Sequence, residues 1–379
     1  MLAAEAVFDA LRGRGATFFT GVPDSLLREL CSCIEERASS TGHVIAANEG
    51  AAVALAAGHH LGSGGLPVVY LQNSGLGNAI NPLLSLADAE VYALPMILIV
   101  GWRGEPAGRD EPQHVKQGRV MLAMLEAMEL PYRVLSPDVE AANADIAWAA
   151  HTARAESRPV ALVVRKGTFA PYTTRDSARR HTGVGVTRER AIALVVDALD
   201  PHDVVVSTTG MISRELFETR VRRGEGTRDF LTVGSMGHAS AIAAAIALAR
   251  PERQVFCLDG DGAYVMHMGS VAVQGQLATP NFKHVILNNG CHDSVGGQPT
   301  VGLACDLTAV ARSCGYTTVD HVADEHGLTE AVRLLRSIAG PALLEIHVLP
   351  GSRPDVRRPS ASPRENKEAF LRFLSSGAS

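Results

Sequence analysis

The sequence predicts an α/β protein with two doubly wound parallel-sheet domains, and three observations support this prediction. The chain has 379 residues, of which 46% are hydrophobic and 20% charged, enough for two to three domains with sizeable cores. Short apolar runs alternate with helix-like segments, and the alternation occurs twice. A polar stretch without apolar periodicity lies between, so we expect domains at 1–172 and 187–379 and a linker at 173–186.

Each half offers six candidate strands, which are short apolar runs punctuated by glycine, proline or asparagine. In the first half they are 16–22, 43–47, 66–71, 96–100, 132–135 and 160–164. In the second half they are 204–207, 230–233, 255–258, 284–287, 317–319 and 343–348. Helices are expected at 266–277 and, after a loop at 351–363, at 366–374.

Composition excludes several classes of function. The net charge of -5 does not suggest a nucleic-acid or lipid surface. No run of about 18 apolar residues predicts a membrane span, and the acidic N-terminal segment is unlike a signal peptide. The six cysteines are scattered without zinc-ligand or redox spacing, so we expect reduced thiols and a cytoplasmic protein.

Polar groups follow two neighbouring apolar runs in the second half. Gly260-Asp261-Gly262 follows one run, and Asn289 follows the next. Carboxyl ends of parallel strands meet at one edge of a sheet, where ligands usually bind. Mg²⁺ prefers oxygen ligands, so Asp261 and Asn289 are predicted to hold it, with a backbone carbonyl just beyond as a third ligand. The two glycines would let a diphosphate approach the backbone at a helix N-terminus.

A tight turn and a hairpin signal are the alternative interpretations of these two motifs. Each motif alone is as compatible with a turn as with a binding site. Both occur here, each after an apolar run and separated only by 263–287, and this combination favours the binding site.

Glu49 is the one ionisable group in the segment 46–58, which follows a strand and opens a helix. Folding would remove water from a lone carboxyl there, which raises its pKa and creates the need for a specific partner. The alternative is a helix-start glutamate favoured by the helix dipole, worth roughly a few tenths of a kcal/mol.

Two further stretches of the first half carry candidate residues. Asp24 and Ser25 follow the first strand, where Asp24 is either catalytic or, like Ser25, a plain helix N-cap. The long polar loop 101–114 contains Arg103 and a single histidine, His114, and loops of this length tend to be functional.

The segment 75–80 almost matches a dinucleotide-binding fingerprint. It lacks the third glycine, and no acidic residue ends a following strand, so NAD binding is not predicted. Asn73, Ser74, Asn78 and Asn81 are instead expected to line a polar loop that faces the ligand.

In this order, the motifs resemble those of the thiamine diphosphate-dependent decarboxylases. The stretches that carry the resemblance are 21–27, 48–60, 101–117, 234–238, 257–270 and 287–300. They span nearly the whole chain and leave no room for the middle domain of pyruvate decarboxylase and acetolactate synthase.

The resemblance implies a pyrimidine-binding first domain and a diphosphate-binding second domain. Thiamine diphosphate and Mg²⁺ would lie between the first domain of one subunit and the second domain of its partner, so a homodimer is the minimum assembly. The cofactor-binding residues would be Glu49, Asn73, Ser74, Met236, Gly260, Asp261, Gly262, Ala263, Asn289 and Cys291. The metal ligands would be Asp261, Asn289 and the Cys291 carbonyl, and Met236 would hold the cofactor in its bent shape.

The resemblance also implies catalytic roles. Glu49 would hydrogen-bond the aminopyrimidine ring and favour the imino tautomer that removes the thiazolium C2 proton. Pyruvate decarboxylases carry a glutamate six residues beyond the second metal-binding asparagine, where this chain has Val295. Acid–base work is therefore assigned to His114 and Asp24, and after them to His292.

Within the family, the resemblance is to enzymes that decarboxylate 3-phosphonopyruvate to phosphonoacetaldehyde and CO₂ in phosphonate biosynthesis, with antibiotic pathways as one setting. Strong donors would bind the phosphonate. The candidates by type and location are Ser25, Arg103, Lys116, His292, Ser294 and Gln298.

Three alternative functions stay open at this point. Sulfopyruvate decarboxylase shares the two-domain plan and is the nearest alternative. An acetolactate-type carboligase is disfavoured by the missing middle domain. A non-catalytic thiamine-binding subunit is disfavoured because it would not need Glu49 together with Asp261 and Asn289.

Overall fold

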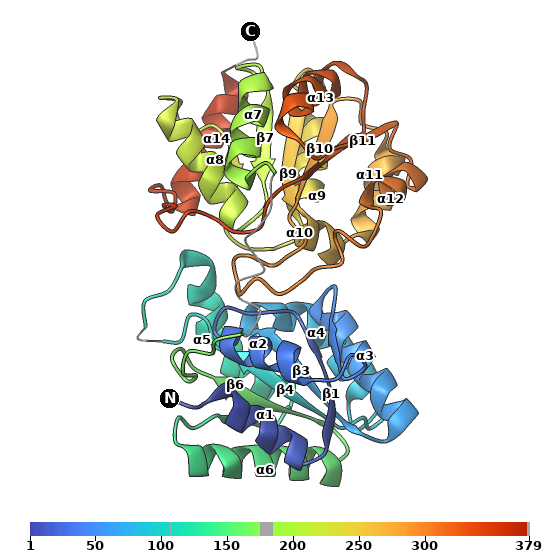
Figure 1. The fold of residues 1–379 in the computed structure, drawn as a ribbon, viewed down its shortest axis with the longest axis vertical. Helices are drawn as coiled ribbons and strands as arrows, with labels where there is room; N and C mark the ends of the chain where they lie inside the picture. Colours follow the sequence, from blue (N-terminus) through green and yellow to red (C-terminus); the bar gives the residue numbers. More distant parts are fainter. Residues whose placement is uncertain (107, 175–184, 377–379) are drawn as a thin grey trace. The chain divides into compact units, whose positions relative to one another are not determined.

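A computed structural model describes residues 1–106, 108–174 and 185–376 (Figure 1). The chain divides into two compact units, unit 1 with residues 1–177 and unit 2 with residues 178–379. Each unit has one six-stranded parallel sheet covered by helices, so the predicted fold class is confirmed. Most of the linker predicted at 173–186 falls on residues 175–184, which lie outside the described residues.

Unit 1 contains the first six strands. They are β1 (Ala16–Gly21), β2 (His43–Ile45), β3 (Leu66–Gln72), β4 (Met96–Gly101), β5 (Tyr132–Val134) and β6 (Pro159–Val164). The helices are α1 (Ala4–Gly13), α2 (Arg28–Arg37), α3 (Glu49–Ser63), η1 (Asn73–Gly75), α4 (Leu76–Pro82), η2 (Leu83–Ala87), α5 (Pro112–Ala127) and α6 (Val139–Ala155). The strand order is β2-β1-β3-β4-β6-β5.

The central strands of unit 1 are buried on both faces, which explains their unbroken apolar runs. In β3, Val68 and Tyr70 join the core that is packed under α1, α2 and α6. Val69 and Leu71 point the other way, into the core under α3, α4 and α5. The alternation of side chains along one strand therefore supplies both layers.

Unit 2 repeats the arrangement with six further strands. They are β7 (Val204–Ser207), β8 (Phe230–Leu231), β9 (Val255–Gly260), β10 (Phe282–Asn288), β11 (Thr318–Val322) and β12 (Ala342–His347). The helices are α7 (Arg188–Ala198), α8 (Met211–Arg222), α9 (Ala239–Ala249), α10 (Asp261–Met266), α11 (Gly269–Leu277), α12 (Leu307–Ser313), α13 (Glu325–Ser337) and α14 (Pro363–Ser375). The strand order is β11-β12-β10-β9-β7-β8.

Two cores also sandwich the sheet of unit 2. Helices α7, α8 and α13 cover one face, and α9 to α12 with α14 cover the other (Figure 1). The final helix begins at a capping box in which the Ser362 and Glu365 side chains each accept from the other's backbone N–H. This accounts for its start three residues before the predicted bound of 366.

Two local expectations are wrong, and one alternative interpretation is excluded. The helix predicted at 266–277 is interrupted, because the chain leaves the helical conformation at His267 between α10 and α11. The polar loop expected at 73–81 is helical, formed by η1 and α4. Neither Asp24 nor Ser25 caps α2, whose N-cap position is Leu27.

All twelve predicted strands are present in the described parts of the chain. Among the helices of those parts, none combines the length and the apolar character that crossing a bilayer requires. All six cysteines are free thiols.

Candidate active site

In unit 1, polar side chains gather where β1, β3 and β4 end. The Asp24 carboxylate is fully buried after β1 and accepts from Gln72 Nε2 at 2.6 Å and from the Leu26 N–H at 3.2 Å. Burial raises its pKa, and the Gln72 hydrogen bond partly opposes that rise. Gly101 is the last residue of β4 and lies against Asp24. A Cβ at residue 101 would overlap the Asp24 carboxylate, so the glycine leaves the space that this carboxylate occupies.

Arg103 is held in place by its surroundings in unit 1. Its Nε donates to Asp110 at 2.8 Å, and its NH1 donates to the Ser25 hydroxyl at 2.8 Å. The Asn73 side chain holds the backbone of residue 103 by accepting from its N–H at 3.1 Å and donating to its carbonyl at 2.8 Å. The structure therefore brings together four predicted site residues, Asp24, Ser25, Asn73 and Arg103.

Glu49 begins α3 directly after the N-cap Asn48 and is buried. Asn78 Nδ2 donates to its Oε2 at 2.7 Å. Burial raises the pKa of the Glu49 carboxyl, and the Asn78 hydrogen bond lowers it by less. Gly75 leaves the space for this carboxylate, since a Cβ at residue 75 would overlap Oε1.

His114 lies in the first turn of α5, which starts with Pro112. The side chain is buried, and burial lowers its pKa to about 4, so the imidazole is neutral at pH 7. Among the described residues, no hydrogen-bond partner meets its Nδ1. A buried nitrogen without a partner is costly, which is typical of a site that a ligand completes. Lys116, also a predicted site residue, is exposed on the same helix.

In unit 2, Asp261 is the first residue of α10 and is 2% exposed. Burial raises the pKa of its carboxyl to about 6. The opposing groups are neutral donors, the Thr300 hydroxyl first and then backbone N–H groups that include that of Asn289. Gly302 backs the carboxylate, because a Cβ there would lie 2.5 Å from Asp261 Oδ2. A buried carboxylate held by neutral donors suits a cation.

Asn289 follows β10 and opens a loop that folds back on itself. The His292 N–H donates to the Gln298 carbonyl at 2.8 Å, and the Thr300 N–H donates to the Gly290 carbonyl at 2.9 Å. Cys291 N–H donates to Asn289 Oδ1 at 3.1 Å. The loop thus brings Thr300 to Asp261 and keeps the predicted ligands Asp261, Asn289 and Cys291 at the ends of two adjacent strands.

The remaining candidates of unit 2 surround the start of α10. A Cβ on Gly262 would lie 2.9 Å from His292 Cε1 and 3.4 Å from Met236 Cε, so these two side chains flank the glycine. Ser294 Oγ would lie 3.5 Å from a Cβ on Gly210. Gln298 is buried in the same loop, and Gly260 and Ala263 lie on either side of Asp261 and Gly262.

One other group in the described part of the chain has the composition of a metal site. Cys257, Asp259 and His284 are fully buried on β9 and β10, with ligand atoms within 4.8 Å of one another. His284 already contacts Asp259 at 3.3 Å and Tyr316 at 3.4 Å. This is a hydrogen-bonded network inside the sheet, whereas the oxygen ligands that Mg²⁺ prefers are those of Asp261 and Asn289.

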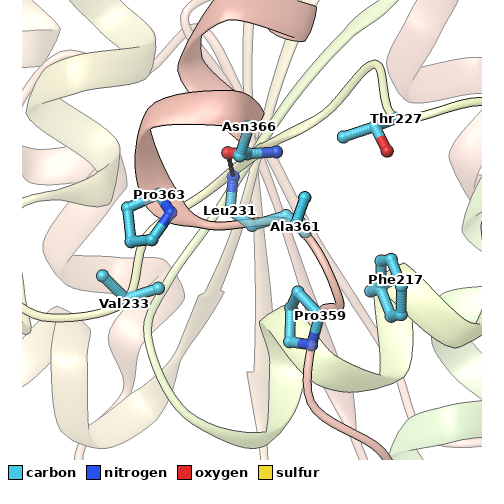
Figure 2. A pocket seen from close by; sticks show the side chains of 8 residues that line it. All are labelled: Phe217, Thr227, Leu231, Val233, Pro359, Ala361, Pro363 and Asn366. Carbon is cyan, nitrogen blue, oxygen red and sulfur yellow. Dashed lines mark hydrogen bonds between the residues drawn. The ribbon is translucent and has the colours of Figure 1, made fainter. Parts of the chain in front are cut away.

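A small apolar pocket of unit 2 is separate from these residues (Figure 2). It is lined by Phe217, Thr227, Leu231, Val233, Pro359, Ala361, Pro363 and Asn366. Asn366 Oδ1 accepts from the Leu231 N–H on its wall at 3.1 Å. No lining side chain is titratable, so the pocket offers no group for acid–base or metal chemistry.

Several residues that organise the site were not predicted from the sequence. Asn78 was expected only to line a polar loop facing the ligand, and no role was predicted for Gln72, Asp110, Asp293 or Thr300. The signals that could have indicated them are a polar side chain at the end of a strand, as at Gln72, or within the stretch 287–300, as at Asp293 and Thr300.

The comparisons with known proteins agree with this arrangement. Residues 1–130 match the family model described as thiamine pyrophosphate enzyme, N-terminal TPP binding domain. Residues 208–346 match the model described as thiamine pyrophosphate enzyme, C-terminal TPP binding domain. The chain therefore belongs to the thiamine pyrophosphate (thiamine diphosphate) enzymes.

Three curated relatives show which decarboxylases the chain is similar to. The chain is 36% identical to phosphonopyruvate decarboxylase of Streptomyces hygroscopicus, over 98% of this chain and 94% of that one. It is 26% identical to sulfopyruvate decarboxylase of Methanosarcina acetivorans, over 98% and 97%. Sulfopyruvate decarboxylase subunit beta of Methanococcus maripaludis is 31% identical and aligns over 98% of its own length with only 50% of this chain.

Proposed function

We propose that this chain decarboxylates 3-phosphonopyruvate to phosphonoacetaldehyde and CO₂, with thiamine diphosphate and Mg²⁺ as cofactors. The identity of 36% to a phosphonopyruvate decarboxylase over nearly both full lengths is the observation that carries the proposal. When bound, thiamine diphosphate supplies the electron sink for the pair left by the departing carboxylate.

Glu49 would hold a proton for the cofactor's aminopyrimidine ring. Its raised pKa means that the buried carboxyl binds a proton more readily than an exposed one. Asn78 donates to Oε2, so Oε1 is the oxygen that remains for the ring nitrogen. A single buried carboxyl at the head of a helix therefore fits the role that the resemblance implies.

The oxygen ligands of unit 2 fit Mg²⁺ and the diphosphate. Asp261 supplies a carboxylate without a salt-bridge partner among the residues described, and Asn289 supplies an amide oxygen. Gly260 and Gly262 open the backbone at the start of α10, with Met236 and His292 flanking the second glycine. These residues would bind and orient the cofactor and take no part in proton transfer.

Proton delivery to the product carbon would come from two residues of unit 1, His114 and Asp24. His114 is neutral at pH 7, so it acts as a base or as a neutral donor and not as an imidazolium. Burial raises the pKa of the Asp24 carboxyl, so it binds a proton more readily than an exposed aspartate does. We assign the acid–base role to these two residues together.

The phosphonate requires positive charge, because it carries up to two negative charges where a sulfonate carries one. Arg103 is already paired with Asp110, so the charge of this arginine is balanced within unit 1. Lys116 and Arg119 are exposed cations of α5, and Lys116 lies two residues beyond His114 in that helix. We therefore assign Lys116 to the phosphonate and Arg103 to orienting the Ser25 hydroxyl.

Two copies of the chain would assemble so that each active site uses unit 1 of one copy and unit 2 of the other. The family plan supports this proposal, as does a relative that aligns nearly its full length with half of this chain. The free thiols of the six cysteines favour a location in the cytoplasm, where thiols stay reduced. Sedimentation with and without cofactor checks the assembly, and a monomer that remains fully active would contradict it.

The decisive assay compares CO₂ release from phosphonopyruvate, sulfopyruvate and pyruvate by one preparation with thiamine diphosphate and Mg²⁺. The largest kcat/KM is expected for phosphonopyruvate. A preference for sulfopyruvate would identify the second candidate, which the full-length relative from Methanosarcina acetivorans favours. Absence of CO₂ release from all three would overturn the decarboxylase assignment.

The Lys116→Met variant tests the assignment of the phosphonate. It should lower kcat/KM for phosphonopyruvate by about tenfold or more, because a charge-assisted hydrogen bond is worth roughly 1.5–3 kcal/mol. Lys367→Met makes the same change of charge on the exposed face of α14 and should have no effect. Equal losses in the two variants would argue against a contact with the substrate.

A further inference from the structure

The orientation of the Asn289 side-chain amide is set by a neighbouring carboxylate at one end and by a backbone N–H at the other. An amide presents an oxygen at one end and an NH₂ group at the other, and only the oxygen binds Mg²⁺. Asn289 Nδ2 donates to Asp293 Oδ2 at 2.7 Å. A carboxylate oxygen accepts hydrogen bonds, so Asp293 selects the NH₂ end, and Oδ1 at the opposite end accepts from the Cys291 N–H at 3.1 Å.

Asp293 is itself held by donors from three parts of unit 2. Its Oδ2 accepts from Arg188 NH1 at 2.6 Å and from the Gly351 N–H at 2.9 Å. Its Oδ1 accepts from the Cys291 thiol at 3.1 Å. With Asn289, these make four donors to one carboxylate, which fixes its position.

Arg188 is anchored on its other side by Glu215. Nε and NH2 of the guanidinium donate to the two Glu215 oxygens at 2.8 Å and 3.0 Å. Side-chain exposures are 4% for Arg188, 1% for Glu215 and 13% for Asp293. Burying three ionisable side chains costs desolvation free energy, and apolar residues would stabilise the loop equally well. We therefore look for a role of the network other than stability.

The charges of the network suit a neighbouring cation. The network holds two carboxyl groups, those of Glu215 and Asp293, around the single guanidinium of Arg188. The Asn289 backbone N–H bonds to Asp261, so the network reaches the other predicted ligand through Asn289. The carboxyl-rich network therefore adjoins the proposed Mg²⁺ site.

We propose that Asp293, held by Arg188, is a positioning residue for the divalent cation because it orients the Asn289 amide oxygen as a ligand. The inference rests on the proposed function, in which Asp261 and Asn289 bind Mg²⁺. Asp293 itself does not touch the cation in this proposal.

The variant Asp293→Asn tests the inference in the full-length protein. Arg188, Gly351 and Cys291 donors compete for the single oxygen of the new amide, so its NH₂ group faces Asn289 and favours the flipped Asn289 amide. Mg²⁺ titration calorimetry at saturating thiamine diphosphate should show a Kd raised about 10–100-fold, the usual effect of losing a residue that orients a metal ligand.

A double variant separates orientation from general loosening of the loop. In Asn289→Asp with Asp293→Asn, the residue at 289 has two equivalent oxygens and the amide at 293 donates to one of them. The hydrogen bond is restored with its direction reversed, and Mg²⁺ affinity should return to within a few-fold of the parent. Failure of this rescue, with the protein folded, would overturn the orientation role.

Asp229→Asn is the matched control. Asp229 is a buried aspartate of unit 2 that accepts from Arg220 Nε at 2.8 Å, so the same substitution also breaks a buried ion pair. It should lower stability and leave the Kd for Mg²⁺ unchanged. An unchanged Kd in Asp293→Asn would also overturn the inference. A parent protein that binds no Mg²⁺ with thiamine diphosphate present would instead refute the proposed function.

Discussion

Units 1 and 2 share one topology but place their chemistry on it differently. Numbered within each unit, both sheets have the strand order 2-1-3-4-6-5, because β11-β12-β10-β9-β7-β8 read backwards gives the same sequence of strands as unit 1. In both, the candidate site residues follow the carboxyl ends of strands. The shared fold therefore determines where a site can form, and the loops determine what it does.

The two sites differ in how charge is handled. Unit 1 presents Glu49 with a neutral partner, Asn78, and His114 with an unmet nitrogen, which are groups suited to hold or move a proton. Unit 2 presents the predicted oxygen ligands, which are fixed by backbone donors and by the ion pair of Asp293 with Arg188. A group that transfers a proton must be able to change its protonation state, whereas a metal ligand must be held in one position.

Glu49→Gln should give the largest effect on turnover, and it should impair the proton transfer assigned to unit 1 without changing metal binding in unit 2. Gln keeps the hydrogen bond from Asn78 but cannot exchange a proton, so kcat should fall by about 10²–10⁴-fold. Calorimetry should show unchanged Mg²⁺ binding in unit 2. Full turnover by this variant would refute the catalytic role of Glu49.

Matched core truncations test whether the units are independent in stability. Leu98→Ala on β4 and Leu344→Ala on β12 each remove a fully buried side chain and should destabilise by about 2–5 kcal/mol. Each should move only the unfolding transition of its own unit in a thermal scan. Equal shifts of a single transition in both variants would show that the two units unfold together.

His43 gives unit 1 a dependence of stability on pH. Burial lowers its pKa from 6.5 to about 4, so the unfolded chain binds a proton between these values that the folded chain does not. Stability should therefore be fully present above pH 6.5 and fall as the pH drops toward 4, by roughly 1–3 kcal/mol.

His43→Gln checks this prediction. Gln can keep a hydrogen bond to the Tyr70 hydroxyl, which His43 Nε2 meets at 2.8 Å. Denaturant unfolding between pH 4 and 7 should show a shallower slope for the variant. Parallel slopes would mean that His43 does not contribute.

A pair of helix caps gives the smallest effect and separates stability from function. Asn48 caps α3 by accepting from the Ala51 N–H at 2.9 Å, and Asp324 caps α13 by accepting from the Gly327 N–H at 3.0 Å. Alanine at either position should cost about 1 kcal/mol. Only Asn48→Ala should also lower kcat, because α3 begins with Glu49. Equal activities would show that the cap does not position Glu49.

The sequence predicted the strands and the residues that follow them because both signals are local. The apolar runs, the pair Asp261 and Asn289, and the lone Glu49 can be recognised within a few positions of each other or of a strand end. The break at His267 could not be recognised in this way, since the residues on both sides of it favour a helix.

Partners distant in sequence could not be predicted. Asp293 and Arg188 are 105 positions apart, and Asn78 and Glu49 are 29 apart, so no periodicity connects them. Thr300 reaches Asp261 only because the loop after Asn289 folds back on itself.

By itself the sequence determined the two parallel sheets, the strand ends that carry chemistry and the kinds of group placed there. Hydrophobic patterning and polar residues after strands are local properties that need no knowledge of the packed chain. Only the tertiary structure decided which groups are buried, which charges are balanced and which way an amide faces. Those depend on donors and acceptors that meet only when distant segments pack together.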